Sequence, residues 1–337
     1  MKGNQIILGQ YKGQEAAAFF KDGQLWDVMI DHDEPIPGTI LRGRVDRPVK
    51  GQGGVFLASP IGSLFLRQVK GVRQGEELLV QVTGFAEDGK AIPVTQDVLF
   101  KSRYAIVTPN KPGRNISRSI KSEERRVELR GLLDEIEAPA EFGVILRSSC
   151  MDSADDAIAE DLIAMLDLAQ AIIGDDETGP ALLLDGDGAH EYAWREWSEP
   201  ADVVEREDAF ETHGVLEALD ALRTSKVMLP NGASMYVEPT RALVAVDVNT
   251  GADNSIGSGV RTTIDALREL PRQLRLRGLG GQIVIDTAPV AKRDRQKVES
   301  VIRTAFRGDL AETALVGWTP LGHIELQRQR SRRPLVL

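Results

Sequence analysis

The sequence Ala242-Leu-Val-Ala-Val-Asp-Val-Asn-Thr-Gly251 is a short apolar run that a single aspartate interrupts, and Gly280-Gly-Gln-Ile-Val-Ile-Asp-Thr-Ala-Pro-Val290 repeats this pattern. Short runs rich in β-branched residues and bounded by glycines predict strands of a sheet that is covered on both faces. Burial of an unpaired carboxylate costs several kcal/mol. We therefore expect Asp247 and Asp286 to be neutralised or to act as ligands of a cation.

The segment between the two runs predicts how the strands pair. Residues 262–277 have the periodicity of an amphipathic helix, so strand, helix and strand form a βαβ unit with parallel strands. Adjacent strands lie about 5 Å apart, so both carboxylates reach one divalent cation at the same end of the sheet. Asn249 falls on the same strand face as Asp247 and is expected to orient that carboxylate. Capping of the next helix is an alternative role for Asp286.

The composition is typical of a globular protein, with 42% hydrophobic and 27% charged residues among 337. No apolar stretch approaches the roughly 20 residues that span a bilayer. The N-terminus has no apolar signal segment, so we expect a cytoplasmic protein without a membrane partner. The only cysteine, Cys150, excludes an internal disulfide and a zinc site built from several cysteines of one chain.

Charge is distributed unevenly along the chain, although the formal net charge is −10. Residues 151–210 contain 18 acidic and 2 basic residues, a local charge of −16, whereas residues 251–337 contain 15 basic and 9 acidic residues, a local charge of +6. Local charge decides where a polyanion docks. The C-terminal region is therefore compatible with a nucleic-acid partner.

Five short segments separated by glycine-rich turns, at residues 39–45, 54–57, 63–66, 76–83 and 91–95, predict a small closed barrel of the OB type. Such barrels bind single-stranded nucleic acid by stacking bases on aromatic side chains. Phe56 and Phe65 either form part of this binding face or belong to the barrel core, and their spacing does not distinguish the two. Elsewhere the sequence predicts an N-terminal hairpin within residues 5–30, helices over 122–137 and 152–173, and a hairpin over 226–237.

The two aspartate runs and the block Leu274-Arg-Leu-Arg-Gly-Leu-Gly-Gly-Gln-Ile-Val-Ile-Asp286 resemble the catalytic region of the ribonuclease E/G family of endoribonucleases. The resemblance extends over nearly the whole chain. Further similar blocks follow in the same order: Gly23-Gln-Leu-Trp-Asp27, Gly38-Thr-Ile-Leu-Arg-Gly-Arg-Val45, Arg103-Tyr-Ala-Ile-Val-Thr-Pro-Asn110, Asn115-Ile-Ser-Arg118, Leu229-Pro-Asn-Gly-Ala-Ser234 and Leu321-Gly-His-Ile-Glu-Leu-Gln-Arg-Gln-Arg330.

The resemblance implies a multidomain α+β fold. It consists of an RNase H-like domain with an inserted OB-fold RNA-binding barrel and a 5′-sensor segment, followed by a DNase I-like α/β catalytic domain. The corresponding ranges are residues 1–37 with 175–235, residues 38–98, residues 99–174 and residues 236–337.

The resemblance also implies an activity, namely magnesium-dependent hydrolysis of single-stranded RNA that leaves 5′-phosphate and 3′-hydroxyl ends, in RNA processing and decay. The expected substrate is A/U-rich RNA, with or without a 5′-monophosphate. Asp247, Asn249 and Asp286 correspond to the catalytic residues, and Asp247 and Asp286 to the magnesium ligands. Phe56, Phe65, Lys90, Arg328 and Arg330 correspond to RNA-binding residues, and Arg147, Ser148 and Arg118 to residues that bind a 5′-phosphate.

The chain departs from the family pattern in several respects. It ends at Leu337, before the cysteine pair through which two family subunits share zinc, so zinc is not expected and any oligomer is not zinc-linked. Serine replaces threonine at position 148 and keeps the hydroxyl. The region 174–210 is shorter and more acidic, which implies a reduced RNase H-like part, and the stretch after Asn249 is less basic.

Two other functions are compatible with these residues. One is an RNA-binding protein that retains the scaffold with little or no cleavage, and the other is a metal-dependent phosphoesterase with a small substrate. The predicted barrel favours a polymeric substrate, because a small molecule needs no stacking platform.

Overall fold

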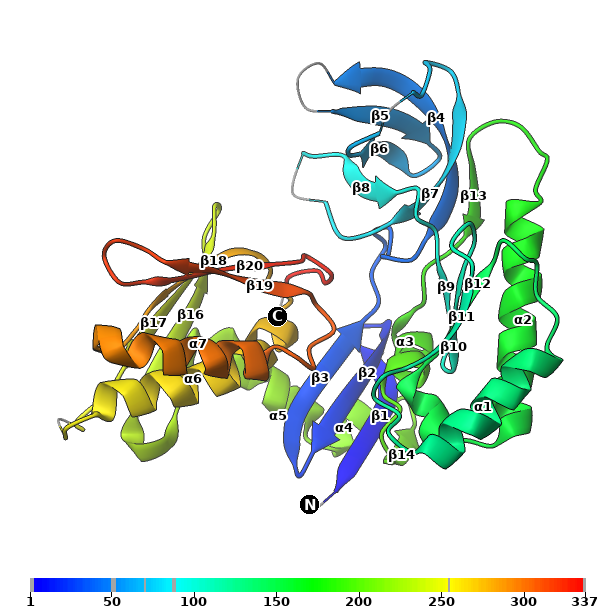
Figure 1. The fold of residues 1–337 in the computed structure, drawn as a ribbon. Helices are drawn as coiled ribbons and strands as arrows, with labels where there is room; N and C mark the ends of the chain where they lie inside the picture. The colour runs from blue at the N-terminus through cyan, green and yellow to red at the C-terminus, as the bar shows by residue number, and fades with distance from the viewer. Residues whose placement is uncertain (1–2, 50–52, 70, 87–88, 254, 336–337) are drawn as a thin grey trace. The chain divides into compact units, whose positions relative to one another are not determined.

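The computed structural model describes residues 3–49, 53–69, 71–86, 89–253 and 255–335. The chain forms two compact units. The N-terminal unit comprises residues 3–17 and 29–204, and the C-terminal unit comprises residues 18–28 and the described part of 205–337 (Figure 1). No helix of the described chain is long and apolar enough to cross a bilayer.

The chain begins with three antiparallel strands, β1 (Asn4–Tyr11), β2 (Gln14–Lys21) and β3 (Gln24–Ile30). With β14 (Asp202–Glu205) they have the order β14-β1-β2-β3. Asp22 and Gly23 connect β2 to β3 with φ angles of 48° and 79°. Positive φ at both positions is the requirement of a type I′ turn. The predicted Asp-Gly hairpin is therefore confirmed.

A closed barrel of five strands follows, as the glycine-rich segment predicts. Its strands are β4 (Ile40–Val49), β5 (Gly54–Ser59), β6 (Gly62–Leu66), β7 (Glu77–Val82) and β8 (Ile92–Thr95). They run in the order β4-β5-β6-β8-β7, and additional pairing between β4 and β7 closes the barrel. Inward residues such as Leu57, Leu64 and Val80 form its core. A strand from further along the chain, β13 (Ala181–Leu184), pairs with β4 from outside.

The second core of the N-terminal unit lies under a four-stranded sheet of order β11-β12-β10-β9. Its strands are β9 (Phe100–Lys101), β10 (Ala105–Thr108), β11 (Gly113–Ile116) and β12 (Gly143–Leu146). Helices α1 (Glu123–Glu135) and α2 (Asp155–Ile173) confirm the two predicted helices, and their apolar residues pack into this core. Ser122 caps α1 by accepting a hydrogen bond from the Arg125 backbone N–H at 3.2 Å. Cys150, in the turn η1 (Ser148–Met151), is buried in the same core.

Short helices connect these elements to the C-terminal sheet. They are α3 (Ala189–Glu196), α4 (Ala209–Thr212), α5 (Val215–Asp220) and the 3-10 turn η2 (Ala221–Arg223). The acidic composition of residues 174–210 gives little periodic signal for β13, α3 and β14.

The C-terminal sheet has six strands in the order β15-β16-β17-β18-β20-β19. They are β15 (Lys226–Met228), β16 (Ser234–Pro239), β17 (Val244–Asn249), β18 (Gly281–Asp286), β20 (Ile324–Arg328) and β19 (Thr313–Trp318). The predicted βαβ unit is present: α6 (Ser258–Leu276) joins the parallel strands β17 and β18. The turns η3 (Pro230–Gly232) and η4 (Lys292–Asp294) and helix α7 (Arg295–Ala305) complete this part. β15 and the first residues of β16 belong to the same sheet and precede residue 236, the domain boundary that the family resemblance implies.

Helices α6 and α7 pack on one face of this sheet and share a core with it (Figure 1). Along β17 the buried residues Val244, Val246 and Val248 alternate with Ala245, Asp247 and Asn249, and both polar residues are exposed. The prediction of a sheet covered on both faces is therefore wrong for this region. The carboxylates of Asp247 and Asp286 lie on an open face, so desolvation does not require a counter-charge for them.

A buried ionic cluster connects the C-terminal strand to the rest of this unit. Asp309 pairs with Arg328 at 2.8 Å and with Arg275 at 3.2 Å, and all three side chains are at most 7% exposed. Asp27 pairs with Arg332, with Nη2 and Oδ2 at 2.8 Å. Burial lowers the pKa of the Arg328 guanidinium below its usual value, and Asp309 acts in the opposite direction. These ion pairs therefore compensate charges that would be costly if left alone.

Replacement of Asp309 with asparagine removes the carboxylate that two buried guanidinium groups share. We expect the free energy of unfolding of the C-terminal unit, measured by urea denaturation, to fall by about 3–5 kcal/mol. Asp265→Asn is the matched control, because the Asp265 carboxylate lies 3.6 Å from a largely exposed Arg268. That change is expected to cost less than about 1 kcal/mol. Equal, small losses for both variants would contradict the structural role of Asp309.

Candidate functional site

A row of polar side chains crosses the open face of the C-terminal sheet. Asp247 of β17 and Asp286 of β18 are directly paired in the parallel register. Tyr236 of β16 is paired with Asp247 on the other side, and Lys226 of β15 is paired with Tyr236. Register pairing places these side chains on one face, because side chains alternate along each strand. The two aspartates that the sequence singles out are thus brought together.

Asn249 lies on the same face, two residues after Asp247. Its Nδ2 donates a hydrogen bond to Oδ2 of Asp247 at 2.8 Å. The amide therefore restricts the orientation of that carboxylate, which is the contact that the sequence predicts for this residue. Asn249 is the last residue of β17, so its side-chain direction follows from the β17 pleat.

His323 is a neighbour of Asp286 that the sequence pattern does not identify. Its Nε2 lies 3.6 Å from Oδ1 of Asp286, and the His323 side chain is 33% exposed. The residue precedes β20, which pairs with β18 from a distant part of the chain. Tyr236 was missed for the same reason, since neighbours across strands are not visible in a single sequence. The alternation of apolar and polar residues along β16 and β20 is the only sequence signal for Tyr236 and His323.

Helix capping does not account for Asp286. The next helical residues are in η4, where Ala291 is the N-cap residue, and α7 begins at Arg295 after Asp294. Neither cap is provided by Asp286. The alternative role that the sequence leaves open for this residue is therefore wrong.

The donor set fits a hard divalent cation. Asp247 and Asp286 present carboxylates from adjacent strands, and neither pairs with a lysine or arginine among the residues that the structure describes. No group of three or more histidine, cysteine, aspartate or glutamate side chains is arranged to hold a metal ion in this described part of the chain. Magnesium commonly uses one or two protein carboxylates and retains several waters, so two carboxylates are sufficient.

The barrel aromatics lie on its outer surface rather than in its core. Phe56 of β5 and Phe65 of β6 are paired across the strands, with ring centroids 5.3 Å apart and an interplanar angle of 44°. Both are partly exposed, whereas Val55, Leu57 and Leu64 fill the core. Of the two alternatives that spacing leaves open, the structure thus favours a surface pair. Lys90, also predicted to contact RNA, is exposed on the loop before β8.

The two C-terminal arginines differ from the prediction. Arg328 is 3% exposed and donates hydrogen bonds to the Leu279 carbonyl and to Thr313, in addition to its ion pair with Asp309. A buried guanidinium cannot contact RNA in this structure, so the RNA-binding role predicted for Arg328 is wrong. Arg330 is partly buried, and its guanidinium lies against Gly281, where φ is +91° and a Cβ atom would collide with it.

The residues predicted to bind a 5′-phosphate follow the ends of two parallel strands. β11 and β12 pair in parallel, with Ile116 opposite Leu146, so Arg118 and Ser148 emerge at the same end. Both are exposed. Arg147 differs, because its side chain is only 17% exposed and pairs with Glu196 at 2.7 Å. Its guanidinium also donates to the carbonyl of Arg195 at 3.1 Å.

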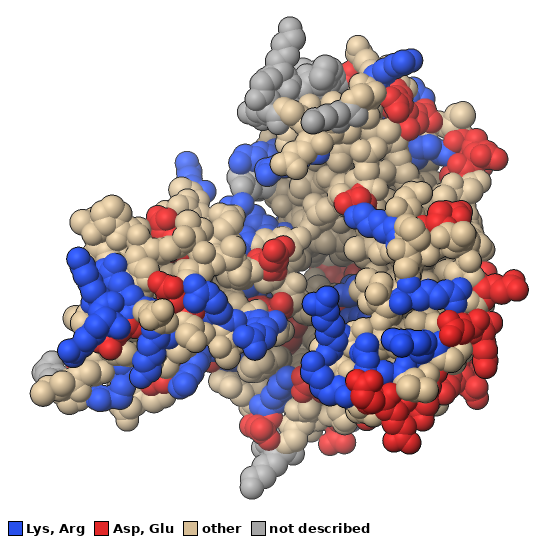
Figure 2. All heavy atoms as spheres, in the orientation of Figure 1, with Lys and Arg blue, Asp and Glu red and all other residues tan. Residues whose placement is uncertain are grey.

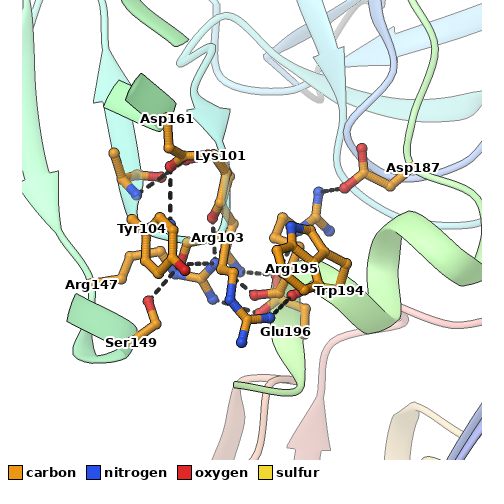
Figure 3. A network of polar contacts seen from close by, with 12 residues as sticks. Lys101, Arg103, Tyr104, Arg147, Ser149, Asp161, Asp187, Trp194, Arg195 and Glu196 are labelled. Carbon is orange, nitrogen blue, oxygen red and sulfur yellow. Dashed lines mark hydrogen bonds and ion pairs between the residues drawn. The ribbon is translucent and has the colours of Figure 1, made fainter. Parts of the chain in front are cut away.

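Glu196 is the centre of this polar network, as Figure 3 shows. Its carboxylate is 2% exposed and pairs with Lys101 at 2.6 Å, Arg147 at 2.7 Å and Arg195 at 2.7 Å. Burial alone raises the pKa of the Glu196 carboxyl, but Lys101 and Arg147 together hold it below its ordinary value. The network joins the end of α3 to β9 and β12, so it stabilises the segment that carries Ser148.

Glu196→Gln leaves three cationic side chains without their shared carboxylate. We expect the variant to unfold with a free energy lower by about 3–5 kcal/mol at neutral pH. Because the folded-state pKa of Glu196 is depressed, its stabilising effect is present above the ordinary value of 4.5 and is lost as the pH falls through the folded-state pKa. Urea denaturation across pH 3 to 7 should show the free energies of unfolding of the two proteins converging as the pH falls. A difference between the two proteins that stays constant down to pH 3 would contradict it.

Basic side chains are concentrated on the helical layer of the C-terminal unit. Figure 2 shows Lys and Arg side chains gathered over α6 and α7, with Asp and Glu more frequent over α1 and α2. The exposed cations of η4, α7 and the turn after it are Lys292, Arg293, Lys297, Arg303 and Arg307. This distribution agrees with the local charges of the sequence, and it gives this unit a surface suited to a polyanion.

The amino-acid sequence matches a known family over more than half of its length. Residues 100–203 and 190–331 match the sequence model of the ribonuclease E/G family. The chain is similar to ribonuclease E of Nostoc sp., with 26% identity over 384 residues that cover 97% of this chain and 56% of the Nostoc protein. It is similar to ribonuclease E of Synechocystis sp. at 27% identity, covering 98% of this chain and 57% of that protein.

Ribonuclease G of Escherichia coli (strain K12) is a further relative. It is 25% identical over 398 residues, which cover 98% of this chain and 81% of the relative. The chain thus spans a little more than half the length of the two ribonuclease E proteins and most of the length of ribonuclease G. From the family match and these relatives, the chain belongs to the ribonuclease E/G family.

Proposed function

We propose that this protein is a magnesium-dependent endoribonuclease that hydrolyses phosphodiester bonds of single-stranded RNA. The observation that carries the proposal is the in-register pairing of Asp247 and Asp286 on the open face of the C-terminal sheet. Membership of the ribonuclease E/G family supports the substrate class. Two exposed carboxylates side by side repel each other, and a divalent cation removes that repulsion.

The residues of the site have separate tasks in this proposal. Asp247 and Asp286 hold the cation, and Asn249 orients the Asp247 carboxylate through its 2.8 Å hydrogen bond. When bound, the cation supplies charge neutralisation at the scissile phosphate and a lower pKa for an attacking water. The resulting ends are a 5′-phosphate and a 3′-hydroxyl. His323, 3.6 Å from Asp286, limits the freedom of that carboxylate from the opposite side.

The barrel is proposed to bind the single-stranded RNA substrate. Phe56 and Phe65 offer partly exposed rings on adjacent strands, and Lys90 is exposed on the same barrel. Stacking on aromatic rings tolerates different bases, while unpaired, A/U-rich strands expose their bases most readily. The partly buried Arg330 remains a candidate for a phosphate contact, whereas Arg328 is left out of the set because it is buried.

The first prediction of this proposal concerns the two aspartates. Asp247→Asn and Asp286→Asn should each abolish cleavage of an A/U-rich single-stranded RNA, because each removes a charge that the cation requires. RNA binding, measured by fluorescence anisotropy in EDTA, should change by no more than about threefold, since phosphate and base contacts dominate affinity. Excess EDTA should stop cleavage by the unsubstituted protein, and added magnesium should restore it.

Asp265→Asn is the matched control for these variants, because it removes a partly exposed carboxylate of the same unit from outside the proposed site. Its cleavage rate should equal that of the unsubstituted protein. Cleavage that persists in the double Asp247→Asn, Asp286→Asn variant would overturn the assignment of the site. RNA binding without cleavage in the unsubstituted protein would instead indicate an RNA-binding protein that retains the family scaffold.

The second prediction concerns the 5′ end of the RNA. Ser148 and Arg118 are exposed at one end of β11 and β12, so we propose that they contact a 5′-monophosphate, with Arg147 fixed behind them by Glu196. RNA with a 5′-monophosphate should be cleaved faster than RNA with a 5′-hydroxyl. The ratio of the two rates should fall by roughly 10-fold or more in the Ser148→Ala, Arg118→Gln variant, as expected for lost charged hydrogen bonds.

Arg130→Gln serves as the control for this experiment, since Arg130 is exposed on α1 and is not among the residues assigned to the 5′-phosphate. It should leave the ratio of rates unchanged. Equal cleavage of the two RNAs by the unsubstituted protein would remove the sensing role from Ser148 and Arg118.

A further inference from the structure

The N-terminal unit contains a pocket of about 550 Å³ that the proposed catalytic chemistry does not use. Its lining includes Arg103, Ser148, His190, Trp194 and Trp197. This volume lies within the range of small-molecule sites in proteins. The lining is mixed, with apolar and aromatic walls and a small number of polar groups, as is usual for a site that binds a flat organic group.

Trp194 is the most unusual residue of this pocket. Trp194 is 65% exposed, whereas Trp197, the C-cap residue of α3 three positions later, is 5% exposed. The Arg103 guanidinium lies over the Trp194 ring, 4.1 Å from its centroid (Figure 3). One face of the indole is therefore covered by a cation, and the large exposed fraction leaves ring surface available to a ligand.

Arg103 has unused hydrogen-bonding capacity in the described structure. Its Nη1 donates to the backbone carbonyl of Trp194, which fixes the guanidinium over the ring. Its Nε is buried and has no hydrogen-bond partner. No carboxylate pairs with Arg103 among the residues that the structure describes, in contrast to Arg147 and Arg195 beside it. The guanidinium is therefore a positive charge held against one face of the indole, with no described carboxylate to neutralise it.

The other charged residues of the pocket limit the class of ligand. Asp152 and Glu199 also line it, so the wall of the pocket carries acidic as well as basic side chains. His190 is engaged with the backbone carbonyls of Gly9 and Ala16 at 3.3 Å and 3.1 Å. The features that remain for a ligand include an aromatic platform, the guanidinium on its covered face and the hydroxyl of Ser148. A flat ring that stacks on the open face of the indole matches this platform.

We propose that this pocket binds one unpaired nucleobase of the RNA, stacked on the face of the Trp194 ring that Arg103 leaves open. This inference rests on the proposed function, because it takes the RNA substrate as the source of the base. Ser148 lines the same pocket, so the bound base belongs to the nucleotides near the 5′ end of the strand. The pocket is a positioning site for the strand and contains none of the catalytic side chains.

The experiment removes the two partners of the proposed stack, the Trp194 ring and the RNA base, one at a time. The full chain carrying Asp247→Asn and Asp286→Asn is titrated in EDTA with a fluorescent 5′-phosphorylated oligonucleotide, and with a series in which one nucleotide at a time is abasic. Trp194→Ala should weaken binding of the intact oligonucleotide by roughly 5- to 150-fold, the range for loss of one base stack. Trp194→Phe retains a ring and should recover most of that loss.

The abasic series identifies the coupled base. At one position near the 5′ end, the abasic change should weaken binding with Trp194 present and have no further effect in Trp194→Ala, which is the non-additivity of groups in contact. Arg103→Gln should show coupling at the same position, and the control Arg130→Gln should show none. The dependence of affinity on salt should be unchanged by Trp194→Ala, since no phosphate contact is lost.

The outcomes separate this inference from the proposed function. If no abasic position is coupled to Trp194 while the unsubstituted protein cleaves RNA, the pocket does not bind a base and the nuclease proposal stands. If one position is coupled but the unsubstituted protein never cleaves, the pocket stands and the nuclease proposal falls. Free UMP and GMP provide a further test. If they protect Trp194 fluorescence from a quencher as well as the oligonucleotide does, the pocket takes free nucleotides, and its role in RNA positioning is overturned.

Discussion

The parallel pairing of β17 with β18 is the constraint from which the arrangement of the site follows. In this register Asp247 is opposite Asp286, and a shift of one residue would turn one aspartate toward the helices. The register is maintained by the buried faces of both strands, where Val246, Ile283 and Ile285 pack with α6 and α7. A hydrophobic constraint on one face of the sheet therefore sets the position of the charged groups on the other.

Ionic clusters have a different part in the two units. In the C-terminal unit, Arg275 and Arg328 share the buried Asp309, so these arginines maintain the fold and are not accessible to a ligand. In the N-terminal unit, the buried Glu196 pairs with Arg147, so this guanidinium also has a structural role. Arg103 and Arg118 have no such carboxylate in the described structure, and Arg118 is exposed. A buried carboxylate partner thus distinguishes structural arginines from candidates for ligand binding better than the position of an arginine in a motif does.

The sequence is sufficient for several elements because their signals are local. Asp22-Gly23 predicts its turn, the five short segments predict the barrel, and the amphipathic pattern of residues 262–277 predicts α6. Prediction fails where the answer depends on a partner distant in sequence. The exposure of Asp247, the burial of Arg328 against Asp309 and the proximity of His323 to Asp286 all depend on which strands become neighbours. The strands β13 and β14 lie in an acidic segment without periodicity, so only pairing with β4 and β1 defines them.

The amino-acid sequence alone specifies the family, the βαβ unit and the three polar residues of its strand ends, because motif spacing and hydrophobic periodicity are properties of contiguous segments. Tertiary packing specifies the rest. It determines that the aspartates face solvent, that Phe56 and Phe65 form a surface pair, and that Arg103 lies over Trp194. The physical reason is that burial, ion pairing and ring stacking are relations between segments that the chain separates by tens of residues, and folding alone brings them into contact.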